Sequence, residues 1–233
     1  MNIADLNQEA RDLCDATTTS YTAATLLRRV NSALETLIGK IIGVSGTWDY
    51  DDTNYTDLPI GKGTLVEGQS SYTFAVNYLQ IKNIKVLDID GTSWRLLYPT
   101  DQSQEGWALE NDLLTDGFPY KYDKVGDTIN LYPAPTAANV TLASGIKIEF
   151  KRTASIFTSG EVTTGTKEPG IASPWHITIA KMAALPYCKS YKKDRVTQLE
   201  RDIAVETASM LKHYGQRERD SRKIMTAARI YHR

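Results

Sequence analysis

With 233 residues, the chain is long enough for one or two domains with a buried core. Its 41% hydrophobic and 24% charged residues are typical of a soluble globular protein, and no apolar run approaches the roughly 18 residues of a membrane span. The first residues lack the basic and apolar regions of a signal peptide, so we expect the chain to stay in the cytoplasm where it is made. Cys14 and Cys188 are far apart and lack the spacing of a metal site, which predicts two free thiols.

The formal net charge of −1 hides an uneven distribution of charge along the chain. Residues 47–155 carry 15 acidic and 9 basic side chains, whereas residues 189–233 carry 6 acidic and 12 basic ones. Opposite charge on two parts of a chain suits head-to-tail contact between copies, or contact with a charged partner. Two separately solvated surfaces explain the same counts, so charge alone leaves both alternatives open.

Two amphipathic helices are predicted near the N-terminus, over residues 2–14 and about 23–42. In both, apolar residues recur at three- and four-residue spacing, which indicates one apolar face. Gly43 and Gly46 are expected to end the second helix. The apolar positions are Ile3, Leu6, Ala10, Leu13, Leu26, Leu27, Val30, Ala33, Leu34, Leu37, Ile38 and Ile41.

From residue 47 to residue 170 the helical period is replaced by short strand patterns. Residues 48–57 predict a loop or irregular strand, and Thr100 or Asp101 is expected to cap a short helix that contains Trp107 and Leu109. Asp90-Gly91 is a strong hairpin signal between two of the strands. Outside the hairpin described next, the predicted strands are residues 71–74, 81–89, 94–98 and 146–151.

A β-hairpin is predicted over residues 117–135. Tyr120 and Tyr122 alternate with polar residues on the first arm, and Ile129 and Leu131 do so on the second, which is the period of a half-buried strand. Gly126 supplies the turn, because glycine takes a positive φ at little steric cost. Pro133 and Pro135 are expected to close the second arm, since proline cannot donate to a strand ladder.

Helical sequence returns at Ser173-Pro174-Trp175, where a capping residue precedes a proline at the first helical position. Pro186 is expected to kink or end this helix, and a further amphipathic helix is predicted over residues 196–214. Gly215 is expected to break the last helix, before a basic segment that continues to residue 233.

The predicted fold is therefore α+β, with a helical bundle formed by residues 1–46 and 171–214. Residues 47–170 are predicted to be an inserted small antiparallel β-sandwich or partly closed barrel. Residues 215–233 are predicted to be an extended C-terminal arm. In this order the helices at both ends of the chain meet, and the strands project from them.

No set of residues predicts a catalytic or metal site, and we expect no cofactor. The three histidines, His176, His213 and His232, have no cysteine or histidine partner at ligand spacing. Asp49, Asp51 and Asp52 lack the glycine and the twelfth-position glutamate of an EF-hand loop, so a solvated acidic loop is the preferred interpretation. Gly61-Lys62-Gly63 lacks the full spacing of a phosphate loop, and paired carboxylates such as Glu105 and Glu110 are common in an acidic domain.

The basic arm allows three interpretations. In the first, its arginines neutralise phosphates and Tyr231 stacks on a base. In the second, the arm is a solvated tail. In the third, the arm becomes ordered on a protein partner that offers carboxylates. Glu218 and Asp220, together with the apolar Ile224 and Tyr231, favour a protein groove over a DNA backbone.

The order of motifs resembles the head–tail connector adaptor proteins of tailed bacteriophages, the group that includes the podovirus tail-tubular protein A. The likeness covers about residues 20–200, and the motif after Gly215 matches in position rather than in detail. Its most telling pair is Gly117-Phe118-Pro119-Tyr120 with Ile129-Asn130-Leu131-Tyr132-Pro133-Ala134-Pro135. The other matching motifs are residues 27–33 (Leu-Arg-Arg-Val-Asn-Ser-Ala), 71–74 (Ser-Tyr-Thr-Phe), 84–97, 156–158 (Ile-Phe-Thr) and 174–176 (Pro-Trp-His).

This resemblance implies a structural protein of the virion and not an enzyme. Members of the group form a ring, usually of twelve copies, beneath the portal vertex. The ring prolongs the channel for double-stranded DNA, which passes without sequence specificity. It also presents a platform to a tail, nozzle or fibre protein. No membrane contact is implied. The implied portal-binding residues are Arg217, Arg219, Arg222, Lys223, Ile224, Arg229, Tyr231 and Arg233.

Two other functions remain open from the sequence. A nucleic-acid-binding protein would use the basic arm and bind DNA in a salt-sensitive way. A tail-associated cell-wall hydrolase would use a carboxylate such as Glu105.

Overall fold

A computed structural model of the chain describes residues 1–44, 50–75, 78–100 and 115–215. The chain contains both helices and sheets, so the predicted α+β class is confirmed. It divides into two compact units, which we call the helical unit and the strand unit. The helical unit consists of Met1–Asn54 and the described residues from Ala154 onward, and the strand unit is Tyr55–Thr153.

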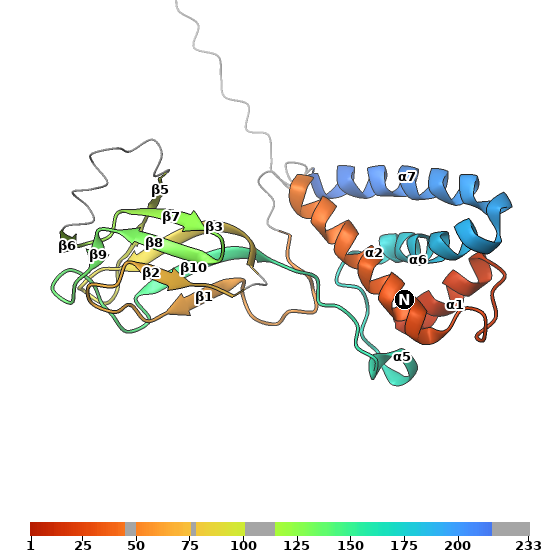
Figure 1. Ribbon diagram of the computed structural model, residues 1–233, viewed down its shortest axis with the longest axis horizontal. Coiled ribbons are helices and arrows are strands. Elements are labelled where there is room, and N and C mark those ends of the chain that lie inside the picture. The colour runs from red at the N-terminus through yellow and green to blue at the C-terminus, as the bar shows by residue number, and fades with distance from the viewer. Residues whose placement is uncertain (45–49, 76–77, 101–114, 216–233) are drawn as a thin grey trace, which may run out of the picture. The chain divides into compact units, whose positions relative to one another are not determined.

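The helical unit contains α1 (Ile3–Leu13), α2 (Ala23–Val44), the one-turn α5 (Glu161–Thr164), a 3₁₀ turn η1 (Ser173–Trp175), α6 (His176–Tyr191) and α7 (Lys193–Gly215) (Figure 1). Helix α1 begins with a capping box, in which the Asn2 side chain accepts from the Asp5 N–H and the Asp5 carboxylate accepts from the Asn2 N–H, each at 3.0 Å. The apolar faces of α1, α2, α6 and α7 pack into one core. Its fully buried members include Ile3, Leu6, Leu26, Val30, Leu34, Leu37, Ile41, Ile179 and Ala183.

At two positions a helix continues through a residue that was expected to end it. Helix α2 continues through Gly43 to Val44, and α6 continues through Pro186 to Tyr191. Tertiary packing explains both, because each helix buries a face along its length that offsets the unfavourable local residue. The other expected stop of the second helix, Gly46, lies outside the described residues, and a kink at Pro186 stays a prediction. The described part of α7 extends to Gly215, the last described residue, so the expected break at this glycine stays a prediction.

The strand unit contains two four-stranded sheets, with strand orders β1-β10-β3-β4 and β2-β8-β7-β5, and a two-stranded sheet of β6 and β9 (Figure 1). Within the described residues neither four-stranded sheet closes into a barrel, so the expected alternative of a partly closed barrel is not supported. Most pairs are antiparallel, but β5 with β7 and β6 with β9 are parallel, which the sequence patterns did not indicate. The strands are β1 (Ile60–Gly63), β2 (Ser71–Thr73), β3 (Tyr78–Leu87), β4 (Trp94–Leu96), β5 (Tyr98–Pro99), β6 (Asp116–Gly117), β7 (Lys121–Val125), β8 (Thr128–Tyr132), β9 (Ala134–Pro135) and β10 (Ile146–Arg152).

The predicted hairpin is present as β7 and β8. Val125 pairs with Thr128, and Gly126 in the turn has a φ of +63°, which only glycine adopts at little cost. Ile129 and Leu131 are fully buried, as their alternation predicts. Their side chains join a core that both four-stranded sheets line, with Ile84 and Val86 of β3 and Ile146, Ile148 and Phe150 of β10.

The strand unit is narrower than the predicted insertion of residues 47–170. Tyr50, Ala154, Phe157 and Ile171 are buried in the core of the helical unit, so the chain on both sides of the strand unit packs with the helices. The helix predicted after Thr100 lies outside the described residues. No helix in the described ranges is both long and apolar enough to cross a membrane.

Candidate functional site

The residues predicted to bind the portal protein all lie in 216–233, outside the described residues, so their role stays a prediction. They are Arg217, Arg219, Arg222, Lys223, Ile224, Arg229, Tyr231 and Arg233. The structure describes α7 as far as Gly215, the residue before this segment. We therefore build the candidate site around α7.

Two buried tyrosines anchor the end of α7. The backbone N–H of Ala172 donates to the Tyr214 hydroxyl at 2.9 Å, and the Tyr50 hydroxyl donates to the carbonyl of Gly170 at 2.6 Å. The two tyrosine rings meet edge to face with centroids 5.2 Å apart. Burial raises the pKa of both tyrosines, so both hydroxyls keep their protons at neutral pH.

The last residue of α7 also lies against the last residue of α2. A Cβ added to Gly215 would lie 3.1 Å from Cγ1 of Val44. The last described turns of α2 and α7 are therefore adjacent, as Figure 1 shows. Gly215, the residue before the segment 216–233, therefore lies beside the last described residue of α2.

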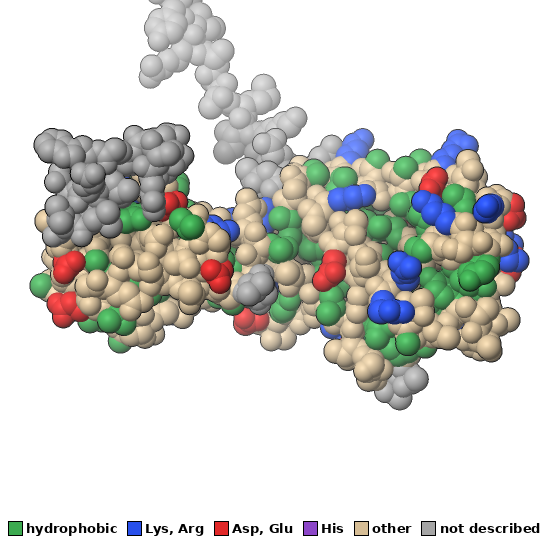
Figure 2. Space-filling view, in the orientation of Figure 1, with side chains coloured by type: hydrophobic (Ala, Val, Ile, Leu, Met, Phe, Trp, Pro, Cys, Tyr) green, Lys and Arg blue, Asp and Glu red, His purple; other side chains and the backbone are tan. Residues whose placement is uncertain are grey.

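An open groove runs along α7, beside α2 and α6. Its volume is about 430 Å³, and Figure 2 shows apolar side chains exposed on the helical unit. We call it the α7 groove; its lining residues are Lys40, Leu185, Glu200, Ile203, Ala204, Thr207, Ala208 and Leu211. Ala204 and Ala208 are exposed within it, whereas Thr207 is buried and its Oγ1 has no hydrogen-bond partner among the described residues.

Asp52 is buried, with 4% of its surface exposed, and it joins the two chain segments that flank the strand unit. Its carboxylate accepts the N–H of Asn54 at 2.9 Å and the N–H of Ser155 at 3.0 Å. Gly170 packs directly on this carboxylate, because a Cβ added there would lie 1.7 Å from Asp52 Oδ1. The predicted acidic loop is thus partly wrong: Asp52 is a buried structural residue and not a solvated one.

His176 is also structural. Its ring is buried, with Nε2 3.0 Å from the carbonyl oxygen of Ile171 and Nδ1 3.0 Å from the amine of Met1. The same amine forms an ion pair with Glu168 at 3.1 Å. Burial is the main cause that lowers the pKa of His176, and the positive amine adds to it, so the ring is neutral at pH 7.

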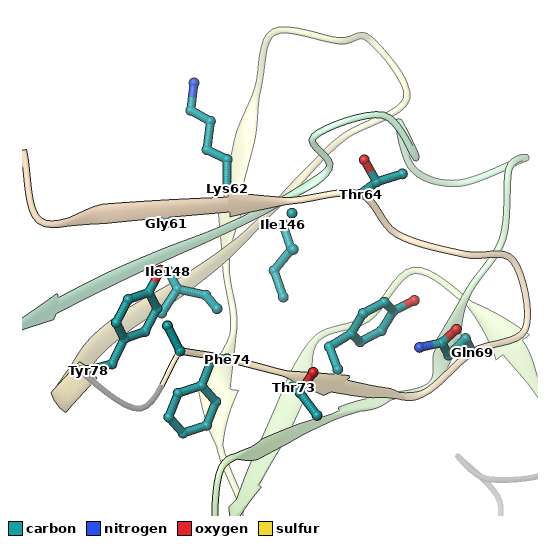
Figure 3. A pocket seen from close by; sticks show the side chains of 12 residues that line it. Gly61, Lys62, Thr64, Gln69, Thr73, Phe74, Tyr78, Ile146 and Ile148 are labelled. Atoms are coloured by element: carbon teal, nitrogen blue, oxygen red, sulfur yellow. The ribbon is translucent and has the colours of Figure 1, made fainter.

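The strand unit has a second hollow, of about 290 Å³, between β1 and β2 (Figure 3). Gly61-Lys62-Gly63, considered as part of a phosphate loop, forms strand β1 on one side of it. Figure 3 shows the side chains of Ile146 and Ile148 between β1 and the segment that carries Thr73 and Phe74. It also shows Tyr78 beneath Gly61, where an added Cβ would lie 2.3 Å from the tyrosine hydroxyl. A strand edge does not offer the cluster of N–H groups at a helix N-terminus that holds a phosphate.

The described residues bring together no group with an evident reaction. They contain no cluster of three or more His, Cys, Asp or Glu side chains that could hold a metal ion. Cys14 and Cys188 are free and fully buried, and burial raises the pKa of the Cys14 thiol to about 11, which disfavours the reactive thiolate. Glu105 and Glu110 lie outside the described residues.

Comparison with known proteins identifies a family. The family model described as "SU10 adaptor protein" matches residues 1–220, which is nearly the whole chain. No curated protein matches the chain. The match covers both units, the end of α7 and the first residues beyond it. The chain therefore belongs to the SU10 adaptor protein family and is a structural adaptor of the bacteriophage head–tail region.

Proposed function

We propose that the chain forms a ring, of twelve copies, between the portal protein and the tail of a phage virion. The family match over residues 1–220 is the observation that carries this proposal. In this assembly the ring prolongs the channel for double-stranded DNA and offers a platform to a tail, nozzle or fibre protein. The fold that serves it is a helical bundle with an inserted β-sandwich.

The symmetry of a ring explains how weak contacts between neighbouring copies can hold the assembly together. Each copy in a closed ring contacts two neighbours through the same pair of surfaces, so weak contacts combine into a stable assembly. We assign the side-by-side contacts to the helical unit, whose surface residues are supported by a large buried core. The strand unit then faces the next tail component.

We assign the portal contact to residues 216–233. Six of these residues are Lys or Arg and two are Asp or Glu, so the segment can pair with portal carboxylates through its arginines. The anchoring of Tyr214 by Ala172 supports this role, because it fixes the point from which the segment leaves the helical unit.

A binding measurement with the portal protein of the same phage tests this assignment. Replacing Arg217, Arg219, Arg222 and Lys223 by alanine should weaken portal binding at least about tenfold, since each lost charge-assisted hydrogen bond costs roughly 1.5 kcal/mol or more. The matched control replaces four lysines of the strand unit, Lys62, Lys82, Lys85 and Lys124, and should leave portal affinity unchanged. Equal affinity of both variants contradicts the role of the C-terminal segment.

The same variants address the nucleic-acid alternative. A DNA-binding segment would bind duplex DNA without the portal, with an affinity that falls steeply between low and physiological salt. We expect the isolated chain to bind DNA too weakly to compete with the portal. Tight, salt-sensitive DNA binding that the four alanine replacements abolish would favour that alternative instead.

A further inference from the structure

We propose that, before the chain meets the portal, its own C-terminal segment 216–233 folds back and occupies the α7 groove. The proposal deepens the function proposed above and rests on it in one respect, because it assigns the same segment a resting position that portal binding must replace. Four observations support it: the position of the groove, the spacing of apolar residues in the groove and in the segment, the charges of both, and the Thr207 hydroxyl that has no partner among the described residues.

The position of the groove puts it within reach of the segment. The segment follows Gly215, which lies beside Val44, the last described residue of α2 (Figure 1). The nearest α7 residue in the groove, Leu211, is four positions earlier on the same helix. Nine residues lead from Gly215 to Ile224, and such a stretch spans up to about 30 Å, more than a reversal of direction requires.

The spacing of apolar residues matches on the two sides. In the α7 groove, Leu211, Ala208 and Ala204 follow one another at intervals of three and four. The segment carries Ile224, Ala227 or Ala228, and Tyr231 at the same intervals. If the segment runs antiparallel to α7, each of its apolar residues faces one groove position in turn, and the two exposed alanines leave room for a large side chain such as Tyr231.

The charges favour this antiparallel direction. Lys40 lies one turn before Val44 on α2, so it marks the end of the groove near Gly215, whereas Glu200 marks the far end. In the segment the acidic Glu218 and Asp220 come first and the basic Arg229 and Arg233 come last. An antiparallel segment therefore brings its acidic side chains near Lys40 and its basic side chains near Glu200. The Glu200 side chain stays half exposed despite its ion pair with Lys189.

The groove also contains an unsatisfied polar group. Thr207 is 6% exposed and its Oγ1 has no hydrogen-bond partner in the described part of the chain. Buried hydroxyls are normally hydrogen-bonded, and a polar group brought in by an occupant would satisfy this one. An occupant that supplies only apolar side chains would not.

The functional consequence is a threshold for portal binding. A segment held in its own groove is available to the portal only for the fraction of time it is released, so its apparent affinity is reduced by that fraction. Filling the groove by Ala208→Arg should free the segment and strengthen portal binding. The charge-neutral change Ser209→Ala, next to it on the helix but outside the groove lining, serves as the control.

Thiol labelling of the isolated chain tests the resting position without the portal. Ala208→Cys places a thiol in the groove, Val205→Cys places one on the same helix outside the groove lining, and the native cysteines are fully buried. With a maleimide probe, Ala208→Cys should react at least about tenfold more slowly in the full chain than in a chain that ends at Gly215. Val205→Cys should react equally in both. Adding Ile224→Asp and Tyr231→Asp to the full chain should restore fast labelling of Ala208→Cys.

Equal labelling of Ala208→Cys in the full and shortened chains overturns the proposal. So does protection that grows with protein concentration, because the segment would then be reaching a second copy. Slow labelling together with no portal binding under any condition would leave the resting position standing and contradict the proposed portal contact, so the two failures are distinguishable.

Discussion

The backbone N–H of Ser155 donates to the carboxylate of Asp52 at 3.0 Å, across 103 residues of sequence. The bond joins the chain just before it enters the strand unit to the chain just after it leaves. Asp52 also accepts the N–H of Asn54. One buried carboxylate therefore holds together the two segments of the helical unit that flank the strand unit. The helical unit thus keeps its shape although its sequence is interrupted by the strand unit.

Asp52→Asn should destabilise the helical unit by about 2 kcal/mol. The amide has one acceptor oxygen instead of two, so one buried N–H loses its partner, and an unpaired buried donor costs roughly 1–3 kcal/mol. Urea unfolding followed by circular dichroism measures the change. Asp12→Asn, which alters an exposed bond to Gln8, is the control and should change stability by less than about 0.5 kcal/mol.

Gly170→Ala should be more damaging than its small size suggests. The added Cβ would lie 1.7 Å from Asp52 Oδ1, so either the backbone or the buried carboxylate must move. Overpacking of this kind costs about 1–3 kcal/mol, and here it also disturbs the bonds of Asp52. Gly160→Ala, whose Cβ would meet nothing within 4 Å, should unfold at nearly the wild-type temperature. Similar melting temperatures for both variants would show that the contact is not tight.

Asn31 should contribute more to stability than a half-buried amide usually does. Its Nδ2 donates to the carbonyl of Phe157 at 2.8 Å, and its Oδ1 accepts the Phe157 N–H at 2.9 Å, so one side chain satisfies both backbone groups of a buried residue. Asn31→Ala should cost about 2 kcal/mol in urea unfolding. Ser32→Ala, at the next position of α2, should cost little. Equal effects would mean that water replaces the amide.

The stability of the helical unit should fall as the pH drops below about 6.5. Burial holds the pKa of His176 below its usual 6.5, so the unfolded chain binds this proton more readily than the folded one. The contribution of His176 to the free energy of unfolding is therefore complete above pH 6.5, and it decreases at lower pH because the unfolded chain binds the proton first. Carboxyl groups with lowered pKa, such as those of Glu149 and Glu161, act only below their usual 4.5.

The test of this pH dependence is the urea midpoint at several pH values between 7.5 and 5.5. The wild-type midpoint should decrease over this range, and His176→Gln should remove the decrease even if it lowers stability at every pH. An unchanged slope in the variant would assign the dependence to another group.

Local patterns in the sequence were sufficient for the elements whose stability is local. The β7–β8 hairpin follows from alternation and Gly126, and α1 and α7 follow from their apolar spacing. Strand β1 was missed, because Ile60–Gly63 contains two glycines and pairs only with β10, almost ninety residues later. The parallel pairs of β5 with β7 and of β6 with β9 were missed for another reason: β5, β6 and β9 are two residues long, too short to show a strand period.

The candidate site was harder to foresee. The buried role of Asp52 depends on Gly170, and the anchoring of Tyr214 depends on Ala172 and on Tyr50, so none has a signature in the surrounding sequence. The α7 groove is a property of three helices together. The apolar stripe of residues 224–231 was visible in the sequence, but the surface that matches it was not.

The central claim is that the chain works as a ring on the portal. The most direct measurement is the mass and rotational symmetry of the chain, alone and co-expressed with the portal protein of the same phage, by negative-stain electron microscopy. We predict a small species alone and, with the portal, a stacked ring with the symmetry of twelve copies. A chain that remains separate from the portal, or that binds it as single unsymmetrical copies, would contradict the account.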